Sequence, residues 1–364
     1  MPNRAQTRPG TPRLSEVARH VVVPKGIVTT GWPAVAGKCA ELGISFRWWQ
    51  TPIGQIILAK RADAKYAATI GGTGLSIPRQ VGKTFLVGAV IFALCLLVPN
   101  LTVIWTAHRL RTAEETFGKM QTFARRKKIW PHVAKVVLGS GEEEVRFKNG
   151  SRILFGARER GFGRGFDEVD VLVFDEAQIL SDAALDDMVP AANQSRQSAS
   201  ALMLFMGTPP KPTDPGGVFR RMRAEALSGE DEDTGWIEFG ADPGFIPTPA
   251  PAALTSADWK QVAKANPSYP KDTPREAILR MRKKLGPEAF QREGLGIWDD
   301  DGRVGLGPVD VSAAPVEPVV LAFDMNPERT MSAIAVAWRG EYGWHAEITH
   351  NEGLVDHRPG SAWV

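Results

Sequence analysis

Apolar runs bounded by turn-forming residues recur between positions 46 and 210 of the chain. Runs of this kind are typical of strands that are buried on both faces of a sheet. Three of them are Leu101–Thr106, Val169–Phe174 and Ala201–Met206, and Ala67–Ile70 is a shorter candidate strand. Because helical patterns lie between these runs, the order predicts an α/β fold with a largely parallel sheet flanked by helices.

The helical patterns differ in polarity. The longest apolar stretch, Phe85–Val98, is too short to span a bilayer, so we expect a buried helix over Lys83–Leu97. A more polar helical pattern covers Arg109–Lys128. The segment Lys148–Ser151 contains Asn-Gly and stands between two short β-rich runs, which predicts a hairpin.

The chain changes character after residue 210. The following hundred or so residues are rich in Pro, Gly and charge, with amphipathic patterns near Asp258–Lys264 and Arg275–Leu285. Three short apolar runs between residues 319 and 349 then predict the first strands of a second sheet. The expected parts are an extended N-terminal segment (1–45), a first domain (46–210), a linker subdomain (211–315) and a partial last domain (316–364).

Composition narrows the class of protein. The 364 residues are 43% hydrophobic, which allows a sizeable core and two or three domains. The formal net charge is only +3, so contacts with nucleic acid have to come from local patches such as Arg125–Lys128 and Arg280–Lys284. Two cysteines exclude a disulfide framework and fit a reducing compartment. We expect no membrane partner, since the sequence has neither an apolar signal core nor a spanning stretch.

Gly82, Lys83 and Thr84 stand where the apolar helix begins. A Gly there lets a ligand approach the backbone, and the first helical amides favour an anion. A Lys can reach β- and γ-phosphate oxygens, and a Thr hydroxyl can bind Mg²⁺. The standard phosphate loop has another Gly five residues earlier, where this chain has Ile77. An ordinary helix start with a solvated Lys is therefore the alternative interpretation.

Asp175 and Glu176 directly follow the apolar run Val171–Phe174 and so end a buried strand. Open α/β sheets bind ligands at that edge. Adjacent carboxylates are costly there unless they face a metal ion or another cation. The alternative is that Asp175 only caps the next helix. Together with the phosphate loop, the pair predicts a nucleotide triphosphatase in which Asp175 binds Mg²⁺ and Glu176 polarises water.

The segment Pro78–Thr84 resembles the variant phosphate loop of tailed-phage terminase large subunits, the motors that package viral DNA. Val171–Glu176 is similar to the second nucleotide motif of that family, and Leu204–Pro209 to its coupling motif. Further similar segments are Trp48–Gln50 beside the adenine, Trp259–Pro267 and Phe290–Glu293 in the linker, and Ala322–Asn326 in a ribonuclease H-like nuclease. The resemblance covers most of residues 46–340. It implies an ASCE-type P-loop NTPase with Walker A and Walker B motifs, followed by a linker subdomain and the start of a ribonuclease H-like domain.

The resemblance also implies roles for individual residues. Glu176 activates the attacking water, and Thr208 senses the γ-phosphate and couples it to the parts that grip DNA. An Arg just before the acidic strand reaches the nucleotide of a neighbouring subunit in similar proteins. Arg164 takes that place here, with Arg158 and Arg160 as competitors. The implied ATP-binding residues are Gln50, Arg79, Gln80, Gly82, Lys83 and Thr84, with Thr84 and Asp175 as Mg²⁺ ligands.

The nuclease part is represented by one acidic residue. Asp324 ends the first expected strand, where the family binds a second divalent metal, Mg²⁺ or Mn²⁺. Such a nuclease needs several carboxylates around two metal ions. Glu347, Glu352 and Asp356 follow Asp324 but form no recognisable partner motif. We therefore expect most of the nuclease domain to be missing, and endonuclease activity only if that domain is complete.

These observations lead to the hypothesis of an ATPase that translocates double-stranded viral DNA into procapsids. The resemblance implies a portal protein and a small terminase subunit as partners and a homo-oligomeric ring, commonly a pentamer. It also implies action in the host bacterial cytoplasm, transiently at the procapsid portal, and absence from the mature virion. One alternative is a helicase-like DNA-dependent ATPase, because Asp175–Gln178 is similar to a helicase motif. The other is a non-catalytic, truncated prophage remnant.

Overall fold

The structure is a computed structural model of the 364-residue chain. The residues it describes are 12–139, 143–158, 162, 166, 168–193, 195, 200–211, 213–299, 320–325, 331–340, 343–348, 350–351, 354–355 and 357–359. The chain divides into two units, residues 1–303 and 304–364. Each unit is described by itself.

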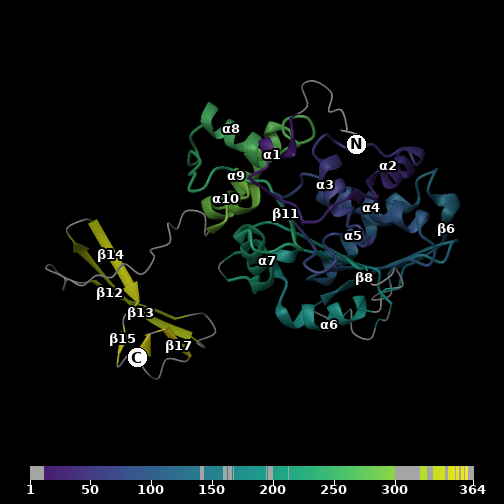
Figure 1. Cartoon of the computed structure of the whole chain (residues 1–364). Helices are drawn as coiled ribbons and strands as arrows, with labels where there is room; N and C mark the ends of the chain where they lie inside the picture. Colours follow the sequence, from purple (N-terminus) through teal and green to yellow (C-terminus); the bar gives the residue numbers. More distant parts are fainter. Residues whose placement is uncertain are drawn as a thin grey trace. The chain divides into compact units, whose positions relative to one another are not determined.

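A nine-stranded sheet forms the centre of the first unit (Figure 1). Its strands are β1 (His20–Val22), β4 (Thr73–Ser76), β5 (Thr102–Ala107), β6 (Val133–Val137), β7 (Glu144–Phe147), β8 (Arg152–Ala157), β9 (Val171–Asp175), β10 (Leu202–Gly207) and β11 (Gly235–Glu238). The order across the sheet is β1-β11-β4-β10-β9-β5-β8-β7-β6. The six strands from β11 to β8 are parallel, and β1, β7 and β6 pair antiparallel at the two edges. The predicted α/β fold with a largely parallel sheet is confirmed.

Helices cover both faces of this sheet. The helices of this unit are α1 (Leu14–Val17), α2 (Trp32–Glu41), α3 (Gln50–Ile57), α4 (Lys83–Leu97), α5 (Leu110–Ala124), α6 (Asp182–Ala192), α7 (Gly217–Ser228), α8 (Ser256–Ala265), α9 (Arg275–Lys284) and α10 (Pro287–Leu295). Helices α2 to α5 share one apolar cluster with one face of the sheet, and α6 and α7 share a second with the other. Along β9, for example, Val171 and Val173 belong to the first cluster, Leu172 and Phe174 to the second. This alternation explains the continuous apolar run, because both faces of the strand are buried.

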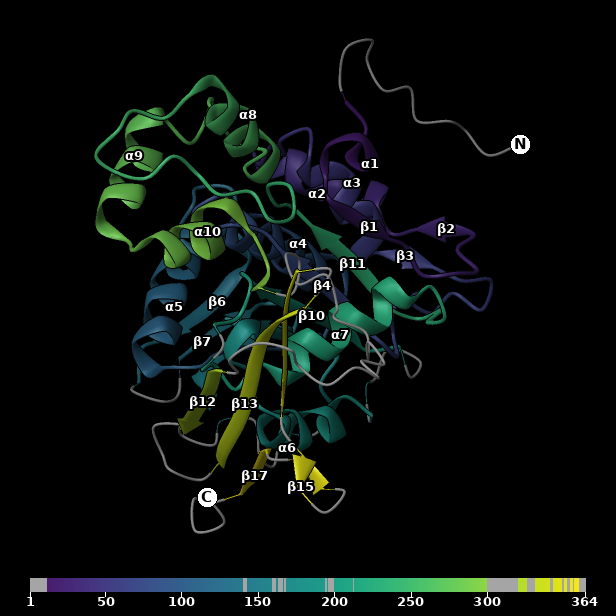
Figure 2. The ribbon, with the colours of Figure 1, turned by 90° about the vertical axis from the view of Figure 1, so that its left-hand side faces the viewer.

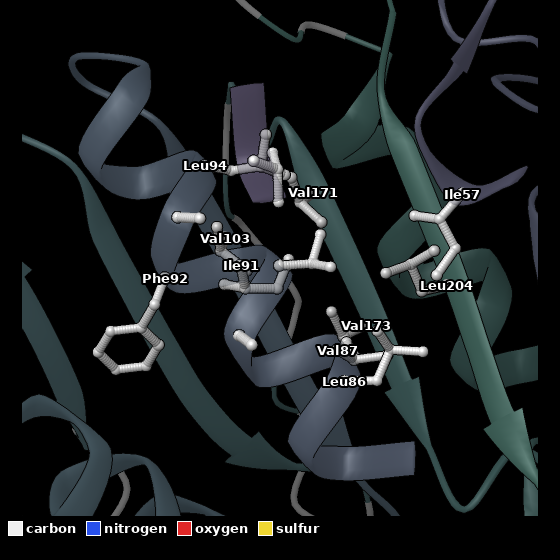
Figure 3. Packing of buried hydrophobic residues seen from close by; sticks show 14 of the residues in the cluster. Ile57, Leu86, Val87, Ile91, Phe92, Leu94, Val103, Val171, Val173 and Leu204 are labelled. Atoms are coloured by element: carbon white, nitrogen blue, oxygen red, sulfur yellow. The ribbon is translucent and has the colours of Figure 1, made fainter. Parts of the chain in front are cut away.

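Helix α4 is the central helix of the first cluster. Figure 3 shows its apolar side chains packed against residues of β5, β9 and β10. Ten consecutive residues from Leu86 to Cys95 are buried, so the helix is apolar all round. The predicted helix over Lys83–Leu97 is confirmed with the same bounds. Within the described part of the chain, no helix has both the length and the apolar character that crossing a bilayer requires.

Most of the predicted elements of the first domain are confirmed. The three long apolar runs form β5, β9 and β10, and β7 and β8 form the predicted hairpin. Helix α5 occupies most of the polar helical pattern and ends at Ala124. The strand predicted over Ala67–Ile70 is wrong, since these residues form turns and the strand β4 begins at Thr73. This strand is not recognisable in the sequence because it contains Gly74, and glycine is uncommon in strands. A Cβ at this position would lie 2.3 Å from the ring of Trp236, so the close approach of β11 requires glycine.

Two regions differ from the expected division of the chain. The segment expected to be extended over 1–45 contains α2, whose Trp32, Val35 and Cys39 are buried against the core. The range expected to form only the linker contains α7 and β11, and β11 pairs with β4 in the large sheet. A short pair, β2 (Thr29–Thr30) with β3 (Ala59–Lys60), lies outside that sheet.

Helices α8, α9 and α10 form a group of their own, drawn in green in Figure 2. They enclose a third apolar cluster that includes Val262, Ile278 and Phe290. The amphipathic patterns predicted near residues 258–264 and 275–285 correspond to α8 and α9 and are confirmed. Helix α10 directly precedes the end of the first unit and carries Glu293 toward the phosphate loop.

The second unit contains a small antiparallel sheet. Its strands are β12 (Val320–Met325), β13 (Met331–Gly340), β14 (Gly343–Ile348) and β17 (His357–Pro359), with β17 pairing to β13. A separate pair consists of β15 (His350–Asn351) and β16 (Leu354–Val355). The three strands predicted in this part of the chain are confirmed.

Candidate active site

The loop between β4 and α4 has an unusual backbone. Gln80 and Gly82 have φ angles of 60° and 116°, which lie in the left-handed region. The angle at Gly82 strains any residue with a Cβ, and a Cβ there would lie 3.3 Å from Nε2 of Gln50. Ile77, in the place of the first Gly of the standard motif, is fully buried, and its N–H donates to the Gly207 carbonyl at 3.1 Å. At this position the chain still runs beside β10, so a large apolar side chain fits.

The acidic end of β9 lies two strands away from β4, with β10 between them. Glu176 has a φ of 54°, and its N–H donates to Oδ1 of Asp175 at 3.0 Å. The Glu176 carboxylate accepts hydrogen bonds from the backbone N–H of His108 at 3.3 Å and from Oγ1 of Thr112 at 3.4 Å. Both donors follow β5, the neighbouring parallel strand, so the sheet edge fixes the direction of this carboxylate.

One cavity of about 260 Å³ brings the predicted residues together. It is lined by Arg79, Gln80, Lys83, Thr84, Thr112, Glu115, Thr116, Lys119, Asp175, Glu176, Gln178, Met206, Gly207 and Thr208. These residues follow the carboxyl ends of β4, β5, β9 and β10. The cavity thus lies at the edge where parallel sheets bind their ligands.

Lys83 points back into the loop. Its Nζ donates to the carbonyl of Ile77 and, at 3.0 Å, to that of Pro78. Burial lowers the pKa of Lys83 to about 8, although the carboxylates of Asp175 and Glu293 oppose this shift. An ammonium that donates to two carbonyl oxygens and is costly to keep charged is suited to binding an anion.

The pKa of Asp175, in the same cavity, is shifted in the opposite direction. Burial raises its pKa above the usual range, while the N–H of Glu176 and the Lys83 ammonium lower it. Its donor set with Thr84 fits Mg²⁺, because this ion takes one or two protein oxygens and completes its shell with phosphates and water. Among the described residues, no group of three or more His, Cys, Asp and Glu side chains is arranged to hold a metal ion.

Gln50 lies on the other side of the phosphate loop. Its Nε2 donates to the Gly82 carbonyl at 3.3 Å, and its Oε1 accepts from the N–H of Arg47 at 2.9 Å. It lines a second cavity of about 400 Å³ together with residues of the loop and the linker. Gln80 lines both cavities. The loop therefore separates Gln50 from Asp175 and Glu176.

The structure describes one of the three arginines that were candidates for reaching the nucleotide of a neighbouring subunit. Arg158 is buried and donates to the carbonyls of Thr106, Asp175 and Glu176 within the same chain at 2.9–3.3 Å. Arg160 and Arg164 lie outside the described residues. Asp324 lies in β12 and Glu347 in β14 of the second unit. Glu352 and Asp356 are outside the described part of the chain.

Several residues at the site were not found from the sequence. Thr112 follows β5 and bonds to Glu176, and Oε1 of Gln178 accepts from the N–H of Thr208 at 3.4 Å. Glu293 pairs with Arg79 and also bonds to Thr208. The rule that ligands lie at the carboxyl ends of parallel strands pointed to the segment that holds Thr112. The segment Phe290–Glu293 was noted only for its similarity to the linker of the family, and nothing in the sequence indicated the contact of Glu293 with Arg79, 214 positions away.

This sheet, with the loop between β4 and α4 and the carboxylates that end β9, has the fold of the ATPase domains of phage large terminases. Among solved structures, the chain is similar to the large terminase of bacteriophage HK97, with a TM-score of 0.54 and 16% identity over 88% of this chain and 67% of that one. For the ATPase domain of the Thermus phage P74-26 large terminase, the TM-score is 0.46 at 14% identity, over 71% and 97% of the two chains. For the large terminase of a thermophilic bacteriophage in complex with ATP-γ-S, it is 0.42 at 12%, over 88% and 68%. No protein-family model and no curated protein matches the chain.

Proposed function

We propose that this chain is an ATP-hydrolysing motor of the terminase large-subunit type, which translocates double-stranded viral DNA into procapsids. One observation carries the proposal: a single cavity is lined by Lys83 and Thr84 of the phosphate loop, Asp175 and Glu176 of β9, and Thr208 after β10. Phosphoryl transfer needs positioning and charge stabilisation more than covalent chemistry, and these groups supply both. The fold shared with the HK97 large terminase supports the same function.

The loop binds the triphosphate in this proposal. The first amides of α4 point at the phosphates, and Lys83 leaves its two carbonyl partners to bind β- and γ-oxygens. Gln50 orients the adenine in the second cavity, on the far side of Gly82. Thr84 and Asp175 hold Mg²⁺. When bound, the ion neutralises phosphate charge and polarises the transferred phosphoryl group.

Glu176 is the residue that we assign to the attacking water. Its carboxylate is oriented by the His108 amide and the Thr112 hydroxyl, so it enters the reaction already positioned. It accepts the proton that the water gives up as the new bond forms. A positioned general base contributes roughly 10²–10⁴-fold to a rate. Thr208 follows β10, the strand between β4 and β9, and lines the same cavity, so we assign it to the γ-phosphate.

Contacts with DNA need no sequence specificity in a packaging motor, because phosphate groups are sufficient partners. The exposed cations of 125–128 after α5, and those at 280, 283 and 284 on α9, supply such contacts. We further propose a portal protein and a small terminase subunit as partners, a ring of five copies, and transient action at the procapsid portal in the host cytoplasm. In a complete nuclease domain, Asp324 would bind a second divalent metal. In the ATPase domain, Arg164 would reach the nucleotide of a neighbouring copy.

The test is ATP turnover by the purified chain and three variants. Lys83→Ala is expected to remove turnover by removing binding, and Glu176→Gln to lower kcat about 100-fold or more while ATP still binds. Glu114→Gln is the matched control, since Glu114 is exposed on α5 and does not line the cavity. Wild-type turnover no faster than that of Lys83→Ala would support a non-catalytic remnant. Separation of DNA strands by the wild type would instead support a helicase-like ATPase.

A further inference from the structure

One side of helix α5 lines the triphosphate cavity with polar side chains. They belong to Thr112, Glu115, Thr116 and Lys119, so the spacings from Thr112 are three, four and seven positions. Residues spaced in this way lie on one side of a helix, one above the other. Thr112 donates to Oε1 of Glu176 at 3.4 Å, so this side of α5 is turned toward the proposed general base. Lys119 is therefore a cation on the same side of α5 as the contact with Glu176.

The Lys119 side chain runs back along α5 toward the start of the helix. Its Nζ lies 3.3 Å from Oε1 of Glu115, the residue one turn earlier. This direction is the ordinary one, because the Cα–Cβ bonds of a helix tilt toward its N-terminus. The first turn of α5 follows β5 at the ligand-binding edge of the sheet and contains Thr112. The ammonium is therefore directed toward the end of the cavity that holds Glu176.

Lys119 and the phosphate loop form opposite walls of the cavity. The loop follows β4 and α5 follows β5, and β10 and β9 lie between these two strands. Neighbouring strands are about 4.8 Å apart, so the strand ends beneath the two walls are about 14 Å apart. Arg79 and Lys83 are the lining cations on the loop side. In phosphoryl transfer, charge is spread over all three equatorial oxygens of the moving group. A cation on the α5 side can meet an oxygen that faces away from the loop.

The ion pair with Glu115 leaves the Lys119 ammonium available to a ligand. The two side chains are 57% and 68% exposed, and an exposed pair of this kind contributes little net stability. A Lys side chain has a flexible four-carbon stem and three donors. The ammonium can therefore turn from the carboxylate to a phosphate oxygen while the backbone of α5 stays in place.

We propose that Lys119 is a catalytic residue that contacts the transferring γ-phosphoryl group from within the same chain. This inference rests on the proposed function, since it names a further group for the same reaction. It differs from the role assigned to Arg164, which concerns the nucleotide of a neighbouring copy. The water oxygen forms the new bond to phosphorus, the bond to the ADP oxygen breaks, and Glu176 takes the water proton. Lys119 stays protonated and neutralises charge on an equatorial oxygen during this exchange.

The test compares Lys119→Met with Arg111→Met, which removes an exposed cation of the same helix that does not line the cavity. Lys119→Met is expected to lower kcat for ATP about 10- to 100-fold and to change KM less than about threefold, because the contact strengthens in the transition state. Arg111→Met is expected to match the wild type. Lys119→Arg is expected to restore kcat to within about fivefold, since it keeps the charge. Melting temperatures within about 2 °C of the wild type are expected for all three variants.

Affinity for a transition-state mimic separates a catalytic contact from a structural one. ADP with aluminium fluoride and Mg²⁺ imitates the transferring group, whereas ATP-γ-S represents the bound substrate. Lys119→Met is expected to weaken binding of the fluoride complex about tenfold or more, and binding of ATP-γ-S less than about threefold. A mixture of Lys119→Met with Glu176→Gln is expected to recover no turnover, because both groups have to act in one chain.

Three results would overturn the inference alone. They are a wild-type kcat in Lys119→Met, equal losses of affinity for the fluoride complex and for ATP-γ-S, and recovery of turnover in the mixture. A wild-type chain that neither binds ATP-γ-S nor hydrolyses ATP would overturn the proposed function, and the inference with it.

Discussion

Replacing Lys83 with Met is expected to stabilise the nucleotide-free protein at neutral pH, although it removes the proposed binding site. Burial lowers the pKa of Lys83 from its ordinary 10.5 to about 8. At roughly 1.36 kcal/mol per pH unit, the charged ammonium therefore costs about 3 kcal/mol in the folded protein. Met has a similar length and no charge. The hydrogen bonds to the carbonyls of Ile77 and Pro78 are lost, which costs about 1 kcal/mol each. The net gain is then about 1–2 kcal/mol.

The sign of the pH dependence follows from the direction of the shift. The unfolded chain holds the proton of Lys83 up to about pH 10.5, and the folded chain only up to about pH 8. The penalty is fully present below about pH 8, shrinks as pH rises between these values, and is absent above them. The advantage of Lys83→Met over the wild type is therefore expected at pH 7. It is expected to vanish at about pH 9, where the remaining penalty equals the roughly 2 kcal/mol of lost hydrogen bonds, and to be reversed at pH 10.

Thermal melting of the nucleotide-free proteins at pH 7 and pH 10 measures this difference. A gain of this size is expected to raise the melting temperature by about 2–3 °C at pH 7. Lys119→Met is the control, because Lys119 lines the same cavity but is 57% exposed, in an ion pair with Glu115. Its stability is expected to change by less than about 0.5 kcal/mol. A Lys83→Met variant that melts below the wild type at pH 7, or above it by the same amount at pH 7 and pH 10, would refute the reasoning.

Three further substitutions test the backbone and the bracing of the site. Gly82→Ala forces a Cβ onto a φ of 116° beside Gln50, and is expected to cost about 1–3 kcal/mol and to weaken ATP-γ-S binding in calorimetry. Arg158→Lys leaves some of the carbonyls at the ends of β5 and β9 without a donor, and is expected to lower stability by about 1–3 kcal/mol in urea unfolding. Gly74→Ala places a Cβ against the Trp236 ring, and is expected to lower the yield of soluble protein or the melting temperature by at least about 5 °C. Wild-type behaviour of any of these variants would contradict the packing described for that residue.

The sequence predicts the parts of the fold in which local pattern and tertiary burial agree. Helix α4 and strands β5, β9 and β10 are apolar throughout because they lie at the centre of the sheet. Strand β4 is not recognisable in the sequence, because it contains Gly74, a residue type that strands disfavour. Glycine is required there because the ring of a neighbouring tryptophan leaves no space for a Cβ. Helix α2 follows a Pro-rich terminus and contains a Gly, so its buried face was not detected.

The sequence likewise predicts only part of the candidate site. Lys83, Thr84 and Asp175 stand beside strand ends, so topology alone brings them to one edge of the sheet. The direction of the Lys83 side chain depends on the local path of the loop, five and six positions before it. The burial of Arg158 and the contact of Glu293 with Arg79 depend on segments that are farther apart in the chain. Such contacts leave no periodic trace in the sequence, and only the folded structure places them.

The most direct test of the central claim is a crystal structure of the whole chain with Mg²⁺ and ATP-γ-S. The account predicts γ-phosphate density between Nζ of Lys83 and the acidic end of β9, with the metal ion against Thr84 and Asp175. A nucleotide bound elsewhere on the chain, with Lys83 still bonded to the Ile77 and Pro78 carbonyls, would contradict it.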